Sequence, residues 1–325
     1  MKPKILVVLR HTLCEEAVRI LEGVGDVSVA PRFIGERELT ELARDCHGVV
    51  LGGNKFGREA IMMAKDLKVI SRHGVGVDNV DIVAATERGI LVTYTPGANA
   101  DSVAEHTFAL LLGLVRKISL ADRSIREGEW GSSEFMGFEL VGKTLGIIGL
   151  GAIGSRIAKR AMAFEMDVMA YDPYVTQERA SALGVKLVDL ETLLRSSDAV
   201  SLHASLTNET RHILTARELG MMRRTAVLIN AARGQLVDEE ALIQALKGGT
   251  VSGAGLDAFQ SEPMPEGHPF MKMRNVLLTP HIASFTKEAL ARGDKILAMD
   301  LAAIFMGRKP IYLANPQALA KSALS

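Results

Sequence analysis

Five short apolar runs in this sequence are each followed closely by residues that could do chemistry. A glycine-rich turn follows the first run, an aspartate the second, an arginine the third, a glutamate the fourth and a histidine the fifth. These residues are Gly149-Leu-Gly151-Ala-Ile-Gly154, Asp172, Arg233, Glu262 and His281. If the runs are parallel strands of one sheet, all five groups emerge along its carboxyl edge, where open α/β sheets bind ligands. The combination predicts a redox site that uses a dinucleotide.

The glycine turn has the spacing of a dinucleotide-binding fingerprint. Gly149 permits the tight turn, Gly151 lets the backbone approach a pyrophosphate, and Gly154 lets the following helix pack on the strand. Ala152 and Ile153 begin that helix, whose N-terminal N–H groups favour phosphates. Taken alone, a glycine turn of this spacing could equally be a structural turn that lets the helix pack on the strand.

Asp172 ends the next predicted strand, DVMAY (167–171), about twenty residues after the turn, where a carboxylate can bind both ribose hydroxyls. The negative charge would repel a 2′-phosphate. Asp172 therefore favours a nucleotide site over a packing turn, and NAD(H) over NADP(H).

Arg233, Glu262 and His281 indicate a site only as a group. An arginine fork suits bidentate capture of a carboxylate, but an arginine in a strand–helix loop is commonly a surface residue. Glu262 could be a turn carboxylate and His281 a solvated histidine. Their shared position at one sheet edge favours a common function.

Alternating strands and helices are needed to position these residues. Residues 4–93 predict strands at 4–9, 26–30, 48–52, 68–71 and 90–93, with helices near 13–22, 36–44, 58–65 and 80–88. This alternation predicts a parallel sheet with helices on both faces. A second alternating series, residues 144–281, carries the glycine turn at its first strand–helix junction. We expect two long helices as well, at 98–126 and 284–306, the latter capped by Ser284 or Thr286.

Composition argues against several functions. Lys+Arg and Asp+Glu both number 38, so no basic excess indicates nucleic acid or an anionic membrane. The longest apolar run, FALLLGLV (108–115), is far shorter than the roughly 20 residues of a membrane helix, and the N-terminal run stops at Arg10, too early for a signal peptide. Cys14 and Cys46 match no disulfide framework or metal spacing, which favours a cytoplasmic protein without a metal.

In their order along the chain, the motifs resemble those of the D-isomer-specific 2-hydroxyacid dehydrogenases. The resemblance covers essentially the whole chain. Besides the glycine turn and Tyr-Asp172-Pro, it rests on Ala-Arg233-Gly-x-x-Val-Asp-Glu, Asp257-Ala-Phe-x-x-Glu262-Pro, Pro-His281-Ile-Ala-Ser, Ser71-Arg-His-Gly-Val75-Gly76-Val-Asp78-Asn-Val-Asp81 and Thr95-Pro-Gly-Ala-Asn-Ala-Asp-Ser-Val-Ala-Glu105-His106-Thr.

The resemblance implies a role for each candidate residue. Arg233 would hold the substrate carboxylate and polarise the ketone, and His281 would exchange a proton with the ketone oxygen while NADH delivers hydride. Glu262 would orient the imidazole and favour its charged form. It also argues for a hydroxyacid, because family members that oxidise formate carry glutamine there. Backbone N–H groups around Val75 and Gly76 would complete the carboxylate site.

The resemblance also implies fold, cofactor and assembly. We expect two doubly wound parallel-sheet domains with a cleft between them: a flavodoxin-like substrate domain from 1–97 and 288–325, and a Rossmann domain from 98–287. NAD would be the cofactor, with Asp257 among the residues that bind it. The apolar helix at 98–126 would build the interface of a homodimer; the alternative is a monomer that buries this helix between its two domains.

The substrate stays open between two groups of 2-oxo acids. The motifs are similar to those of 3-phosphoglycerate dehydrogenases, but a phosphate needs cationic or N–H partners. Here Trp130 is followed by Gly-Ser-Ser-Glu134, and the third strand ends in Leu51-Gly-Gly-Asn, which leaves Lys55 and Arg72 as the nearby cations. We expect a small or uncharged-tail substrate such as hydroxypyruvate/D-glycerate or glyoxylate/glycolate, with 3-phosphoglycerate as the alternative. A non-catalytic NAD-binding regulator is a further alternative.

Overall fold

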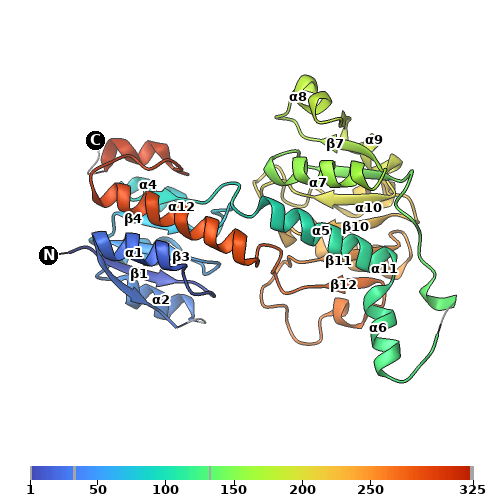
Figure 1. Ribbon diagram of the computed structural model, residues 1–325, viewed down its shortest axis with the longest axis horizontal. Coiled ribbons are helices and arrows are strands. Elements are labelled where there is room, and N and C mark those ends of the chain that lie inside the picture. Colours follow the sequence, from blue (N-terminus) through green and yellow to red (C-terminus); the bar gives the residue numbers. More distant parts are fainter. Residues whose placement is uncertain (1, 32–33, 132, 323–325) are drawn as a thin grey trace. The chain divides into compact units, whose positions relative to one another are not determined.

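The structure, a computed structural model, describes residues 2–31, 34–131 and 133–322 and divides into two compact units (Figure 1). The first unit comprises Met1–Asn99 and Phe285–Ser325, and the second comprises Ala100–Ser284. Each unit is built around its own parallel sheet. In the described ranges, no helix is both long and apolar enough to span a membrane.

The first unit contains a five-stranded sheet in the order β2-β1-β3-β4-β5, with every pair parallel. This 2-1-3-4-5 order is that of flavodoxin-like folds, as predicted. The strands are β1 (Lys4–Val8), β2 (Asp26–Val29), β3 (Gly48–Leu51), β4 (Val69–Arg72) and β5 (Leu91–Thr93). The helices are α1 (Glu15–Val24), α2 (Glu36–Ala43), α3 (Arg58–Met63), α4 (Ile82–Glu87) and α12 (Lys287–Phe305), followed by the short helix η4 (Pro316–Lys321).

Successive residues of these strands alternate between two apolar cores. In β1, Ile5 and Val7 pack with α1 and α12, while Leu6 and Val8 pack with α2, α3 and α4. Because helices cover both faces, the central strands are apolar throughout rather than alternating with polar residues.

The second unit contains a seven-stranded parallel sheet in the order β12-β11-β10-β9-β6-β7-β8. Counted within the unit from the other edge, this order is 3-2-1-4-5-6-7, the Rossmann order with one more strand, as predicted. The strands are β6 (Thr144–Ile148), β7 (Asp167–Tyr171), β8 (Lys186–Leu187), β9 (Ala199–Leu202), β10 (Val227–Asn230), β11 (Gly253–Leu256) and β12 (Val276–Leu278).

Helices cover both faces of this sheet as well. In β10, Val227 and Ile229 pack with α5 and α7, which lie side by side (Figure 1), while Leu228 packs with α9, α10 and α11. The helices are α5 (Ala100–Val115), α6 (Ile118–Arg126), α7 (Ala152–Ala163), α8 (Gln177–Ala182), α9 (Leu190–Ser196), α10 (Ala216–Met221) and α11 (Glu239–Lys247), with short helices η1 (Ser133–Phe135), η2 (Gly234–Leu236) and η3 (Pro269–Lys272).

The single helix predicted over residues 98–126 was wrong, because the segment forms two helices. α5 ends at Val115 and α6 begins at Ile118, with Lys117 between them at a left-handed φ of 57°. The N–H of Lys117 bonds the carbonyl of Leu114 (3.2 Å), and a left-handed residue of this kind ends a helix. At the other long helix, α12, the hydroxyl of Thr286 caps the first turn.

Candidate active site

The candidate residues of the second unit follow the carboxyl ends of five strands in one sheet. The glycine turn follows β6, Asp172 follows β7, and Arg233, Glu262 and His281 follow β10, β11 and β12. All strands of the sheet are parallel, so these residues emerge along one edge, as the sequence predicts. β10 and β6 are separated only by β9, which places the two groups of residues roughly 10 Å apart along the edge.

The glycine turn leaves room for a ligand at the start of α7. Gly149 has a φ of 96°, and a Cβ there would lie 2.6 Å from the backbone nitrogen of Ala204. A Cβ at Gly154 would overlap the carbonyl oxygen of Gly149, whereas no described atom lies within 4 Å of the Cβ position at Gly151. No side chain caps α7 and its first turn holds no acid. The N–H groups that begin at Ala152 and Ile153 thus fit a pyrophosphate.

Asp172 is tied to the glycine turn by its carboxylate. One oxygen accepts the N–H of Leu150 (2.8 Å) and the other accepts the N–H of Tyr174 (2.9 Å). An ionised carboxylate has about four acceptor positions, so this half-buried group keeps capacity for ribose hydroxyls. Asp172 is therefore fixed next to the turn with its charge at the sheet edge.

His281 and Glu262 form an ion pair in the candidate site. Nδ1 of His281 lies 2.7 Å from Oε2 of Glu262, and Oε1 of Glu262 accepts the N–H of Phe259 (3.0 Å). Burial raises the pKa of Glu262, but the hydrogen bond and charge of His281, the Phe259 N–H and the charge of Arg233 outweigh burial and lower the pKa. An ionised Glu262 thus fixes the ring through Nδ1 and leaves Nε2 for proton exchange.

Arg233 lies on a turn that packs directly against the turn carrying Glu262. Gly234 makes this contact possible, because a Cβ there would overlap the backbone of Phe259. The side chain of Asn230 donates to the carbonyl of Arg233 (2.9 Å) and so holds the turn. Arg233 is near enough to lower the pKa of Glu262 by its charge. The structure thus brings Arg233, Glu262 and His281 together.

Asp257 is buried and holds the backbone on the C-terminal side of His281. Its carboxylate accepts the N–H groups of Ile282 (2.9 Å) and Ala283 (2.8 Å) and the hydroxyl of Thr279 (2.6 Å). His281 lies between these contacts with a left-handed φ of 55°. Asp257 therefore fixes an unfavourable backbone conformation, a role that the sequence analysis did not predict; its contact with the cofactor stays a prediction.

Sequence reasoning also missed the side chain that packs on Asp257 from α5. Nε2 of His106 lies 2.9 Å from the hydroxyl of Thr279 and 3.5 Å from Oδ1 of Asp257. His106 belongs to a motif that carries the family resemblance, but no local pattern links it to a strand end so far along the chain. Only the packing of α5 on β11 and β12 brings these residues together.

The predicted substrate-binding residues of the first unit follow β3 and β4. Lys55 is exposed and its ammonium lies 3.6 Å from a carboxylate oxygen of Glu36. Val75 and Gly76 lie in the loop after β4, with Val75 37% exposed. Lys55 therefore already has an anionic partner in Glu36.

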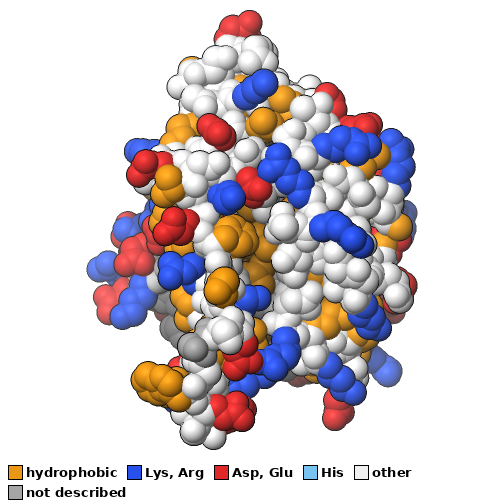
Figure 2. All heavy atoms as spheres, turned by 90° about the vertical axis from the view of Figure 1, so that its right-hand side faces the viewer, with side chains coloured by type: hydrophobic (Ala, Val, Ile, Leu, Met, Phe, Trp, Pro, Cys, Tyr) orange, Lys and Arg blue, Asp and Glu red, His pale blue; other side chains and the backbone are white. Residues whose placement is uncertain are grey.

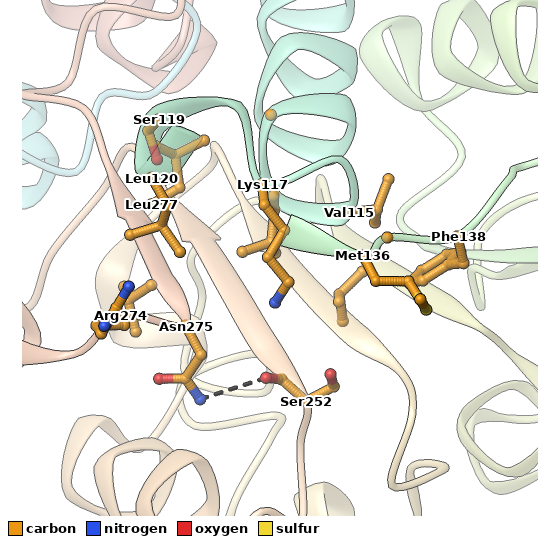
Figure 3. Close-up of a pocket in the computed structure, with 15 residues that line it drawn as sticks. Val115, Lys117, Ser119, Leu120, Met136, Phe138, Ser252, Arg274, Asn275 and Leu277 are labelled. Atoms are coloured by element: carbon orange, nitrogen blue, oxygen red, sulfur yellow. Dashed lines mark hydrogen bonds between the residues drawn. The ribbon is translucent and has the colours of Figure 1, made fainter. Parts of the chain in front are cut away.

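A separate pocket of about 330 Å³ lies at the opposite edge of the seven-stranded sheet (Figure 3). Lys117, Met136, Phe138 and Asn275 line it, and the Asn275 amide donates to the carbonyl of Ser252 (3.3 Å). It lies where strands begin rather than end, so it is not part of the candidate active site.

Comparison with known proteins identifies the family. Residues 108–283 match the family model described as "D-isomer specific 2-hydroxyacid dehydrogenase, NAD binding domain". A glyoxylate reductase of Thermococcus litoralis is 41% identical over 332 residues, covering 99% of each chain. The crystal structure of a glyoxylate reductase from Paecilomyes thermophila is similar with a TM-score of 0.87 and 30% identity, covering 97% of this chain and 99% of that one. The chain belongs to the D-isomer specific 2-hydroxyacid dehydrogenase family.

NAD(H) is the cofactor that the matched domain binds, in agreement with the glycine turn and Asp172. A D-3-phosphoglycerate dehydrogenase of Archaeoglobus fulgidus is 46% identical over 296 residues, which are 91% of this chain. The chain spans only 56% of the length of that relative.

Proposed function

We propose that the protein is an NAD-dependent oxidoreductase that interconverts a D-2-hydroxyacid and its 2-oxo acid. The observation that carries this proposal is the His281–Glu262 pair (2.7 Å) next to the Arg233 turn, at the same sheet edge as the glycine turn. A proton donor, a carboxylate-binding cation and a nucleotide site are the groups that reduction of a 2-oxo acid requires.

Each side chain has one task in this proposal. NADH, when bound, supplies the hydride. Arg233 binds the substrate carboxylate with its guanidinium and polarises the ketone. His281 gives a proton to the ketone oxygen from Nε2, and Glu262 stabilises the charged ring that precedes the transfer. In the oxidative direction His281 takes the proton back.

The charges near the first unit's strand ends favour a small substrate. Lys55 is paired with Glu36, and the guanidinium of Arg72 bonds the carbonyl of His73. Both cations that a phosphate could use thus already have a polar partner. We therefore propose hydroxypyruvate/D-glycerate or glyoxylate/glycolate, in line with the full-length similarity to a glyoxylate reductase. 3-Phosphoglycerate is the second candidate, because five similar relatives are named D-3-phosphoglycerate dehydrogenases.

NADH consumption by the purified protein distinguishes these candidates. Hydroxypyruvate, glyoxylate and phosphohydroxypyruvate would be compared by kcat/KM. We expect one of the two uncharged-tail acids to be preferred. A preference for phosphohydroxypyruvate by about tenfold, the size of effect that one good binding contact gives, would contradict the proposed substrate and leave the proposed reaction intact.

We also propose a cytoplasmic homodimer. Both cysteines are free, which suits a reducing compartment. Large apolar side chains are exposed on α6 and the segment after it: Ile118, Ile125, Trp130, Met136 and Val141, with Trp130 90% and Met136 79% exposed. Figure 2 shows hydrophobic side chains gathered near the middle of one face, with several Lys and Arg side chains around them. Large exposed apolar side chains are typical of a protein interface.

A further inference from the structure

Three side chains able to bind a metal meet in the first unit, and none of them is among the predicted site residues. His11 follows β1, His73 follows β4, and Asp294 lies in α12. Nε2 of His11 is 2.8 Å from Oδ1 of Asp294, and Nε2 of His73 is 3.1 Å from the same oxygen. The ligand atoms of all three residues lie within 4.8 Å of one another.

The cluster is nearly buried and contains an ionised carboxylate. The side chain of Asp294 is 2% exposed, and those of His11 and His73 are 13% exposed each. Burial raises the pKa of Asp294, but hydrogen bonds from both histidines and from the N–H of Cys14 outweigh burial and lower it to about 2. An ionised carboxylate faces two imidazoles in a place with little solvent.

Neighbouring groups hold the three side chains in this arrangement. The second oxygen of Asp294 accepts the N–H of Cys14 (2.9 Å), which fixes the carboxylate plane. Gly293 lets His73 lie against α12, because a Cβ there would be 2.5 Å from Nε2 of His73. Supporting contacts of this kind orient the ligands in metal sites.

We propose that His11, His73 and Asp294 bind a zinc ion. Two imidazoles and one carboxylate are a common ligand set for zinc, with water in the fourth position. Ligand atoms of a tetrahedral zinc site lie about 3.4 Å apart, so the N–O distances of 2.8 and 3.1 Å would lengthen by about 0.6 and 0.3 Å. Binding requires each ring proton to move from Nε2 to Nδ1, the other neutral tautomer.

The ion would join three segments that are far apart in the chain. His11 and Asp294 are 283 residues apart, and the zinc would tie the ends of β1 and β4 to α12. Since the ion binds the folded unit, it stabilises that unit.

Metal titration of the full chain after dialysis against a chelator tests the site. Zn²⁺ binding would be followed by calorimetry and by Tm, and Co²⁺ binding by its visible absorption. We expect one ion per chain and a rise in Tm of roughly 5 °C when free Zn²⁺ is about 100 times the Kd. The variants H11Q and H73Q keep an N–H that can bond Asp294, and each should weaken binding by at least about tenfold. The control H47Q changes a histidine of the same unit outside the cluster and should bind as the wild type does.

A measurement on the wild type keeps the test decisive even if a variant fails to fold. In an NMR spectrum of the histidine ring nitrogens, Zn²⁺ should shift the signals of two of the eight histidines. Absence of binding by wild type below about 100 μM would overturn the proposal, since a folded three-ligand site binds far more tightly. Equal Zn²⁺ binding by wild type, H11Q and H73Q would overturn the proposal as well. The three side chains would then serve only as hydrogen bonds between segments of the first unit.

Discussion

At the scale of single residues, the proposed chemistry depends on how each side chain is held by its neighbours. Glu262 bonds both the imidazole of His281 and the backbone of Phe259, so the ring has one defined orientation. Arg233 lies on a turn that contacts the same backbone through Gly234. Their shared position after the ends of predicted strands, together with the family resemblance, predicted these three groups. Their mutual support depends on backbone contacts that a sequence does not display.

Replacing Arg233 by alanine should affect both substrate binding and turnover. In the proposed reaction the guanidinium contacts the carboxylate in the ground state and the polarised ketone in the transition state, so KM should rise and kcat should fall. We expect kcat/KM for the 2-oxo acid to fall roughly 100- to 1000-fold, as when one electrostatic donor is lost. R195A, which removes an exposed arginine paired with Glu191, is the control. An unchanged kcat/KM would remove Arg233 from the site.

Replacing Glu262 by glutamine should change the pH dependence of reduction. The pKa of Glu262 is lowered by its contact with His281, so the carboxylate is charged at neutral pH and favours a protonated ring. Without that charge the ring loses its proton at lower pH, and the alkaline limb of the kcat/KM profile should move to lower pH. A profile at the same position as that of the wild type would show that His281 acts independently of Glu262.

At the scale of elements, the strand ends were predictable because buried parallel strands are short apolar runs that stop abruptly. Such alternation predicts a parallel sheet, and in a parallel sheet Gly149, Asp172 and Arg233 lie along one edge. The break between α5 and α6 was not predictable, because Lys117 carries no sequence signal for a left-handed φ. The contact between His106 and Thr279 was missed for another reason, since it depends on how α5 packs on the sheet.

Replacing Asp257 by asparagine should disturb the segment that carries His281. One amide oxygen cannot accept all the hydrogen bonds that the two oxygens of Asp257 accept from Thr279, Ile282 and Ala283. We expect the free energy of unfolding to fall by about 1–3 kcal/mol, the cost of leaving a buried polar group unpaired, with kcat reduced as well. Urea unfolding and turnover would be measured together. D189N, at the exposed cap of α9, should leave both nearly unchanged.

At the scale of the whole molecule, the exposed apolar side chains after α5 support a dimer. The double variant W130D/M136D places charges at two of these positions, whose side chains are 90% and 79% exposed. Light scattering should give the wild type a mass of about 70 kDa, twice the 35.0 kDa of one chain. The variant should have the mass of one chain, because unpaired charges oppose burial at an interface. M62D, on α3 of the first unit, should keep the wild-type mass. A monomeric wild type would contradict the proposed dimer.

Oxidation of the two enantiomers of glycerate with NAD⁺ tests the central claim most directly. The proposed function predicts NADH formation from D-glycerate, its near absence from L-glycerate, and loss of activity in H281N. Turnover of L-glycerate at an equal kcat/KM would contradict the assignment of a D-2-hydroxyacid dehydrogenase. The same conclusion would follow from a fully active H281N.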